Sequence, residues 1–173
     1  MIKELLIRNK IAIVSNWIQL IIETYPSATS NFLKSQKDQF SNPVGHIISD
    51  SIGKIFDEIV NSRNIDKIKL LLKDIIKIRA VQDFLPSDAV GFIFSLKKVI
   101  RDEIEQEIKE EKNLNELVII ESFIDKIALV AFNLYMDARE KVFQIRVNEI
   151  KSKLPFNNEK GTKDFEAEIK MNT

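Results

Sequence analysis

The sequence predicts an all-α protein: a bundle of about six helices that ends in one long C-terminal helix. Three observations predict this class. Apolar residues recur at spacings of three and four along most of the 173 residues, which is the period of one helix face. Glycine and proline number only four each, and the three prolines before the predicted tail stand at predicted helix starts. No segment alternates apolar and polar residues over a length that would build a sheet.

The apolar period and the breaks between its runs predict helices over 2–24, 27–39, 43–61, 65–80, 86–110 and 113–151. The first ends at Tyr25-Pro26, because the residue before a proline avoids the helical conformation. Asn42 followed by Pro43 is typical of an N-cap with proline at the first helical position. The helix that follows is therefore expected to begin at Pro43.

The last three predicted helices are bounded by polar runs and by one proline. A polar run at 61–64 separates the helix over 43–61 from the helix over 65–80. Pro86 with Ser87 and Asp88 begins the next helix. After Lys153 the composition becomes mostly polar, so we expect one domain over 1–153 and a mobile polar tail over 154–173.

The helix predicted over 113–151 carries apolar residues for almost four heptads. The positions that we expect to form a seam are Ile120, Ile124, Ile127, Leu134, Val142 and Ile145. At ~1.5 Å per residue this helix is about 58 Å long. A compact domain of this size measures only about 40 Å across. We therefore favour a homodimer built on this helix, and the alternative is a helix that lies on the core of its own chain.

The charge balance and the absence of cysteine exclude several kinds of function. Lys and Arg number 26, as do Asp and Glu, so no net charge attracts nucleic acid or anionic lipid. The absence of cysteine excludes disulfides, thiolate metal ligands and thiol nucleophiles. The N-terminal apolar run is interrupted by Asn16 and Gln19 and has no cleavage site. We expect a soluble, cytoplasmic protein with no nucleic-acid partner and no membrane insertion.

Residues that usually carry catalysis or cofactors are scarce. The glycines are isolated, so the chain has no phosphate-binding loop or dinucleotide motif. With one histidine, neither a zinc-protease motif nor a di-iron bundle site can be assembled. We expect no catalytic residues, no cofactor and no metal, and therefore no enzymatic activity.

Two interpretations stay open for His46, which falls in the first turn of the helix over 43–61. It is either a partly exposed histidine at a helix start or an axial haem ligand or distal-pocket group. On the second interpretation the chain is a sensor that holds haem or an acyl-like molecule between helices, with Phe92, Phe94 and Phe132 as candidate lining.

Charged and amide groups meet where the helices over 65–80 and 86–110 are joined. Arg79 is placed to pair with Asp83, and Gln82 to bond free backbone groups at the helix end. We favour a capping role over ligand recognition for this junction.

The last helix carries Arg139, Arg146 and Asn148. If these side chains face inward, they would fix the register across a dimer.

Five stretches carry a family resemblance: Glu23–Pro26, FLKSQKDQF (32–40), NPVGHII (42–48), IRAVQDFLPSDAVGFIFSLKKVIR (78–101) and ALVAFNLYMDAREKVFQIRVNEIK (128–151). On these stretches the chain resembles the N-terminal domain of the RsbT co-antagonist protein RsbRD. The resemblance covers nearly everything before the predicted tail. It implies a globin-like helical fold without haem, paired as a homodimer, that passes a stress signal to a partner.

The resemblance also marks signature positions, which it implies to be mainly structural: Pro43, His46, Arg79, Gln82, Asp83, Pro86, Arg139 and Asn148. In RsbRD-type proteins this domain precedes a STAS domain that engages the kinase RsbT within a stressosome. Here only a short polar stretch follows the last helix. We therefore expect a stand-alone member that keeps the sensory and dimerising half, and direct antagonism of RsbT does not carry over.

Together these observations predict a regulatory module whose partners are a second copy of itself and a signalling protein. Signal would pass by a shift of the long helices between two packing arrangements. A ligand sensor with His46 near its pocket is the alternative. A helical-bundle enzyme is a third possibility, against which the lack of a second histidine, glycine-rich loop or cysteine argues.

Overall fold

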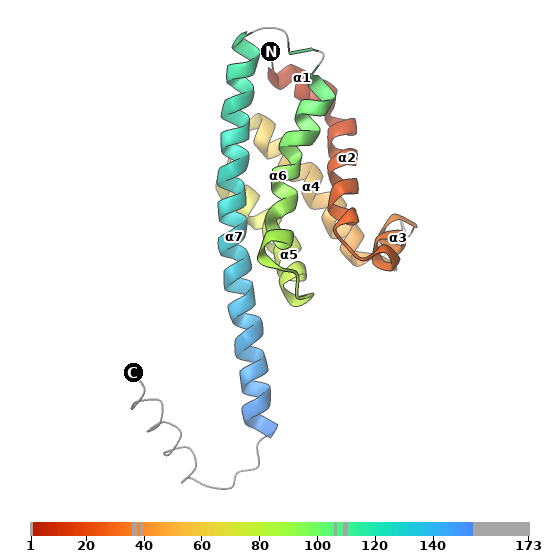
Figure 1. Cartoon of the computed structure of the whole chain (residues 1–173), viewed down its shortest axis with the longest axis vertical. Coiled ribbons are helices and arrows are strands. Elements are labelled where there is room, and N and C mark those ends of the chain that lie inside the picture. The colour runs from red at the N-terminus through yellow and green to blue at the C-terminus, as the bar shows by residue number, and fades with distance from the viewer. Residues whose placement is uncertain (1, 36–37, 39, 106, 109–110, 154–173) are drawn as a thin grey trace, which may run out of the picture. The chain divides into compact units, whose positions relative to one another are not determined.

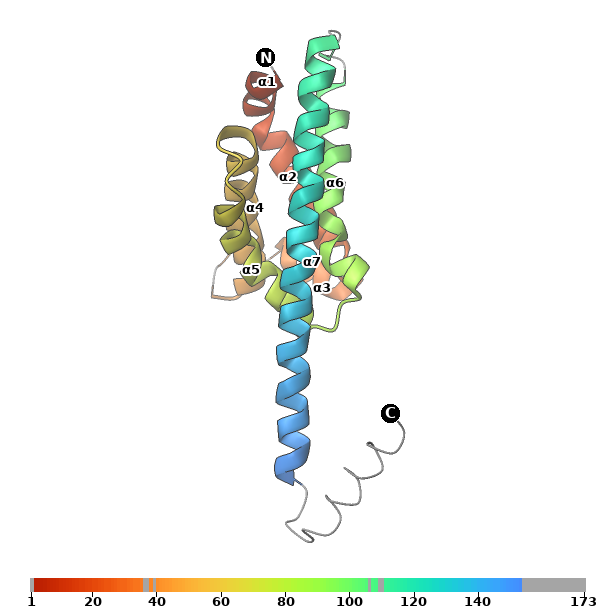
Figure 2. The same ribbon diagram turned by 90° about the vertical axis from the view of Figure 1, so that its left-hand side faces the viewer.

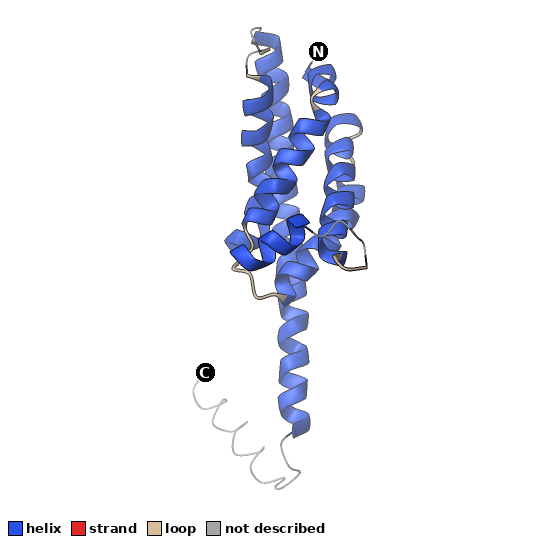
Figure 3. Cartoon of the chain, turned by 90° about the vertical axis from the view of Figure 1, so that its right-hand side faces the viewer, coloured by secondary structure: helices blue, strands red, loops and turns tan. Residues whose placement is uncertain are grey.

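The computed structural model describes residues 2–35, 38, 40–105, 107–108 and 111–153. In this part of the chain every regular element is an α-helix (Figure 3). The seven helices are α1 (Ile2–Arg8), α2 (Lys10–Glu23), α3 (Ser27–Ser35), α4 (Pro43–Asn61), α5 (Ile65–Val81), α6 (Pro86–Ile104) and α7 (Glu111–Lys153). The predicted all-α bundle with a long C-terminal helix is confirmed. The chain divides into two compact units, Met1–Glu140 and Lys141–Thr173, and the predicted tail lies outside the described residues.

The prediction of one helix over 2–24 was wrong, because the chain breaks at Asn9 into α1 and α2, which are bent by 71°. The backbone N–H and the side-chain amide of Asn9 both donate to the carbonyl of Leu5, at 3.0 and 3.1 Å. A side chain that competes for backbone acceptors favours such a break. Among the described residues no single helix has the length and apolar character to cross a membrane, and α1 and α2 meet these criteria only as a bent pair.

The start of α4 depends on a side-chain cap that needs a glycine. Asn42 Oδ1 accepts a hydrogen bond from the N–H of Gly45 (2.8 Å), as expected of an N-cap before Pro43. The side-chain amide of Asn42 donates to the carbonyl of Leu33 in α3 (3.1 Å). A β-carbon on Gly45 would lie 2.3 Å from Nδ2 of Asn42. The absence of a β-carbon at Gly45 therefore leaves the space that the side chain of Asn42 occupies when it caps α4.

α6 begins at Pro86 as predicted but ends at Ile104 instead of 110. The N–H groups of Glu107 and Ile108 both bond the carbonyl of Ile104, at 2.9 and 3.1 Å, so the chain turns there. The residues after Ile104 are mostly charged, and they offer little apolar surface to continue a packed helix. Part of the segment predicted for α3 lies outside the described residues.

Within Met1–Glu140 the helices bury one apolar core. α2 lies beside α6, and α4 and α5 form a helical hairpin (Figure 1, Figure 2). The indole N–H of Trp17 donates to the carbonyl of Phe92 (2.7 Å), which joins α2 to α6 inside the core. The part of α7 in this unit is joined to α6 by an ion pair between Lys97 and Asp125 (2.5 Å). It also contributes buried apolar residues: Leu117, Ile120, Ile124, Ile127, Ala128, Ala131 and Tyr135.

Candidate functional site

Arg79, in the last turn of α5, is fully buried where α2, α5 and α6 meet. It forms no ion pair with a carboxylate among the described residues, and three oxygen acceptors hold it instead. Nη2 donates to the carbonyl of Ile21 (3.2 Å) and to the hydroxyl of Thr24 (2.9 Å). Nη1 donates to the carbonyl of Asp88 in the first turn of α6 (2.9 Å). The C-terminus of a helix carries partial negative charge, which favours the guanidinium at the end of α2. The hydrogen bond to Asp88 joins this end to the start of α6.

Three aromatic rings surround the guanidinium of Arg79. Its Cζ lies 5.2 Å from the ring centre of Tyr25, 4.8 Å from that of Phe84 and 4.9 Å from that of Phe92. Ring faces attract a cation, which offsets part of the lost hydration. Burial lowers the pKa of Arg79 and raises the pKa of Tyr25, and the charge of Arg79 acts against the rise at Tyr25.

The second residue of the α5–α6 loop (residues 82–85) is left-handed and is not glycine. Asp83 has a φ of 59°. Its N–H points to the carbonyl of Ala80 (3.4 Å), and the N–H of Phe84 bonds the carbonyl of Arg79 (3.2 Å). This pair of bonds is a Schellman motif, in which Asp83 occupies the position that glycine usually fills. Aspartate tolerates this conformation better than most residues, at some cost in free energy.

Two side chains of α7 hold this loop. The hydroxyl of Tyr135 donates to the carbonyl of Phe84. Arg139 donates to the carbonyl of Ala80 (2.9 Å) and forms an ion pair with Asp83. This bond to Asp83 raises the pKa of Arg139. Because Tyr135 and Arg139 are four residues apart, they lie on the same face of α7.

The structure corrects the pairing predicted at this junction. Arg79 does not pair with Asp83, which pairs with Arg139 instead, so Arg139 is engaged within its own chain. Gln82 is exposed and caps α5 with its backbone N–H, which bonds the carbonyl of Ile78 (3.0 Å). Sequence reasoning missed Tyr135, although it stands four residues before Arg139 in the same matched stretch.

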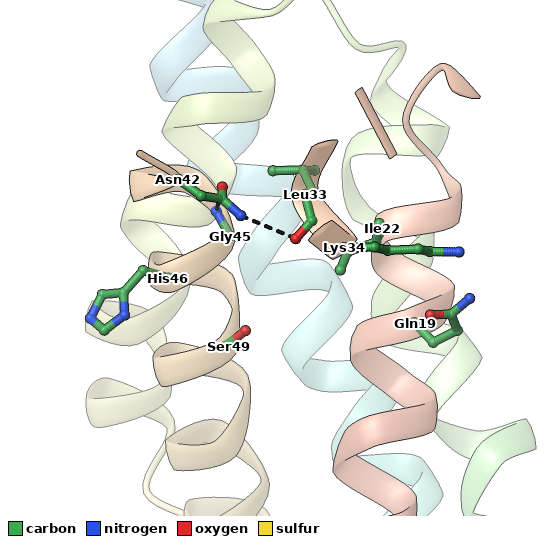
Figure 4. A pocket seen from close by; sticks show the side chains of 8 residues that line it. All are labelled: Gln19, Ile22, Leu33, Lys34, Asn42, Gly45, His46 and Ser49. Atoms are coloured by element: carbon green, nitrogen blue, oxygen red, sulfur yellow. Dashed lines mark hydrogen bonds between the residues drawn. The ribbon is translucent and has the colours of Figure 1, made fainter. Parts of the chain in front are cut away.

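His46 lies at the edge of a pocket of about 490 Å³ between α2, α3 and α4. The pocket is lined by Gln19, Ile22, Leu33, Lys34, Asn42, Gly45, His46 and Ser49. Figure 4 shows the imidazole of His46 turned away from Leu33, Ile22 and Gln19, and the residue is exposed. No group of three or more metal-binding side chains occurs in the described part of the chain.

The aromatic side chains named as candidate lining do not line this pocket. Phe92 is buried beside Arg79 and Trp17, whereas Phe94 and Phe132 are exposed. Pro43 and Pro86, the two prolines among the signature positions, each occupy the first helical position of α4 and α6.

The six residues predicted as a dimer seam differ in their surroundings. Ile120, Ile124 and Ile127 are buried in the core of their own chain, so they have no surface to offer a second chain. Leu134 and Val142 are half-buried, and Ile145 is exposed, as is the signature residue Asn148.

The family model of the RsbT co-antagonist protein rsbRD N-terminal domain matches residues 11–150. The chain belongs to this family. The match covers all eight signature positions and both helices that meet at the α5–α6 loop. The family is one of regulatory signalling domains and is not known as an enzyme family.

Comparison with curated proteins and with solved structures gave no match. The globin-like character that the resemblance implies therefore stays a prediction, within a fold that is all-helical in the described residues.

Proposed function

We propose that this domain is a regulatory module of stress signalling that works as a homodimer formed along α7. It relays a signal to a partner protein through a change in the packing of α7. The observation that carries the proposal is a set of large apolar side chains on α7 that the chain leaves exposed. Membership of the RsbRD N-terminal domain family supports the signalling role.

Within Met1–Glu140, three exposed apolar side chains lie along one face of α7. Leu129 is 68% exposed, Met136 is 49% exposed and Phe132 is 43% exposed. Their spacings of three and four residues place them on one stripe of the helix. A continuous apolar stripe on a protein surface marks an interaction site more often than isolated apolar residues do.

The described part of the second unit, Lys141–Lys153, carries exposed apolar side chains of its own. Phe143, Ile145 and Ile150 are 62%, 59% and 61% exposed. In the sequence, Leu129, Met136, Phe143 and Ile150 follow one another at intervals of seven residues. A seven-residue repeat of apolar residues is the pattern by which two helices form a coiled coil.

The intervening core positions of this repeat are mixed. They are occupied by Phe132, Arg139 and Arg146, and the side chain of Arg139 is already engaged by Ala80 and Asp83 of its own chain. Charged residues at core positions of a coiled coil lower its stability and restrict its register. A seam of moderate stability suits a module that changes between two packing arrangements, because neither arrangement then dominates strongly.

The relay to a partner follows from the same two-state argument. A partner protein that binds one arrangement of α7 better than the other shifts the population toward that arrangement. A signal that shifts the same population changes the affinity for the partner. The proposed partners are therefore a second copy of the chain and one signalling protein.

Disulfide trapping tests the dimer directly. The chain has no cysteine, so a single introduced cysteine is the only thiol. We expect Phe143→Cys and Met136→Cys to form interchain disulfides rapidly under mild oxidation, because equivalent core positions face each other in a parallel pair. Lys141→Cys is the matched control, since two residues correspond to roughly 200° around a helix. Equally slow cross-linking of all three variants would refute the dimer along α7.

A further inference from the structure

The α5–α6 loop contacts Arg79 and Tyr25 on one side and α7 on the other. The ring of Phe84 lies 4.8 Å from Cζ of Arg79 and packs edge-on against Tyr25, with 5.1 Å between ring centres. The carbonyl of the same residue accepts the hydrogen bond from Tyr135 of α7. Phe84 thus links the end of α2, through Arg79 and Tyr25, to the middle of α7.

In the conformation described, which we call closed, Phe84 of the α5–α6 loop contacts Arg79 and Tyr135. Two features raise the free energy of this closed conformation. Asp83 holds a left-handed backbone conformation, which costs aspartate some free energy although less than it costs most other residues. Arg79 is fully buried without a carboxylate partner among the described residues, so its charge has lost hydration that ring faces and carbonyls replace only in part. Opening the loop would relieve both, since water would reach Arg79 and Asp83 would be free to adopt a negative φ.

A second left-handed residue shows what is particular to Asp83. Arg63 follows α4 with a φ of 50°. It is exposed and forms no ion pair with a described residue. Of the two, only Asp83 is tied to another helix, through Arg139. The closed conformation of the α5–α6 loop therefore depends on α7, whereas the turn at Arg63 is local.

We propose that the α5–α6 loop is a latch: Tyr135 and Arg139 of α7 hold it closed over Arg79, and its release lets α7 change its packing. The inference rests on the proposed function, because there the packing of α7 carries the signal. In the open state Phe84 leaves Arg79, and both α7 side chains lose their loop acceptors. Met136, an exposed residue of the apolar repeat on α7, is next to Tyr135 in sequence, so release of the latch acts beside the proposed dimer interface.

Hydrogen exchange of the full chain tests the latch with a variant that spares the packing. Tyr135→Phe removes one hydroxyl and keeps the ring. We expect amide exchange to become about ten-fold faster at 80–88 and at 128–140, because the carbonyl of Phe84 loses its partner. Exchange at 48–60, in α4, should stay unchanged. Arg139→Gln should act in the same direction.

Two glycine variants form the matched control. Asp83→Gly and Arg63→Gly both place glycine at a left-handed position, so both relieve the backbone. Only Asp83→Gly also removes the ion pair to Arg139. We expect Asp83→Gly to accelerate exchange in α7 and to change the rate of disulfide formation at Phe143→Cys, and Arg63→Gly to do neither.

The outcomes separate the latch from the dimer. If Tyr135→Phe and Asp83→Gly accelerate exchange at 80–88 alone, and α7 exchanges and cross-links as in the parent chain, the loop is a passive cap and the latch is overturned. A parent chain that stays monomeric overturns the dimer, and the latch is then still decided by the exchange rates, which are read within a single chain.

Discussion

Two sets of apolar residues on α7 have the same helical spacing and opposite surroundings. Ile120, Ile124 and Ile127 are at most 2% exposed, in the core of Met1–Glu140. Phe143 and Ile150, in the second unit, are more than 60% exposed. A helical period in a sequence therefore identifies an apolar face but not the surface that covers it. The first set stabilises the fold, and we assign the second to assembly.

The largest expected effect comes from a charge in the buried set. Ile127→Asp places a carboxylate in the core without a partner, and we expect it to lower the free energy of unfolding by about 4 kcal/mol or more. Urea denaturation followed by circular dichroism measures this change. Ile145→Asp makes the same substitution at an exposed position and should change the stability of a single chain by less than about 0.5 kcal/mol. Similar losses of stability in both variants would contradict the division of α7 into a part that is buried in the core and a part that is exposed.

A charge in the exposed set should act on assembly and not on folding. We expect Phe143→Asp to weaken dimerisation by roughly 100-fold, because a large apolar side chain at the centre of an interface contributes about 2 to 4 kcal/mol. Sedimentation velocity over a concentration series measures the dissociation constant. Gln144→Asp adds the same charge at the next position and serves as the control. Loss of helicity in Phe143→Asp would show instead that this region belongs to the folded core.

Polar contacts between α6 and the buried part of α7 should contribute less to the free energy of unfolding than the buried apolar residues do. Glu121 is mostly buried and accepts two hydrogen bonds from Arg101, at 2.5 and 2.7 Å. We expect Glu121→Gln to lower the free energy of unfolding by about 1 kcal/mol. Asp102→Asn removes the exposed pair with Lys98 (2.9 Å) and should cost about 0.3 kcal/mol. Equal costs in urea denaturation would mean that burial of Glu121 adds nothing.

The smallest expected effect tests where the exposed apolar repeat of α7 begins. Ser122 is exposed and stands seven residues before Leu129, where the apolar repeat is interrupted. Ser122→Leu should extend the repeat and tighten the dimer a few-fold, by about 0.5 to 1 kcal/mol. Ser15→Leu on α2, which lies outside the repeat, is a control for added apolar surface. Unchanged affinity in Ser122→Leu would place the start of the seam after this residue.

Local signals explain which parts of the fold were predictable. The starts of α4 and α6 were predicted correctly because Pro43 and Pro86 act on their immediate neighbours. The break at Asn9 was missed because an asparagine between Arg8 and Lys10 is compatible with a continuous helix. The early end of α6 at Ile104 was missed because the charged residues that follow still favour a helix in isolation.

The candidate site was predictable in composition but not in pairing. Sequence reasoning located Arg79 and Asp83 at one junction, four residues apart. The partner of Asp83 is Arg139, which is 56 residues away along the chain, so only the tertiary structure brings them together. The hydrogen bond from Tyr135 to Phe84 spans 51 residues and was missed for the same reason.

The mass of the chain in solution tests the central claim most directly. Sedimentation equilibrium over a wide concentration range should give a mass near twice the 20.0 kDa of one chain, and Phe143→Asp should shift it toward 20.0 kDa. A parent chain that sediments at 20.0 kDa at every concentration would contradict a dimer formed along α7.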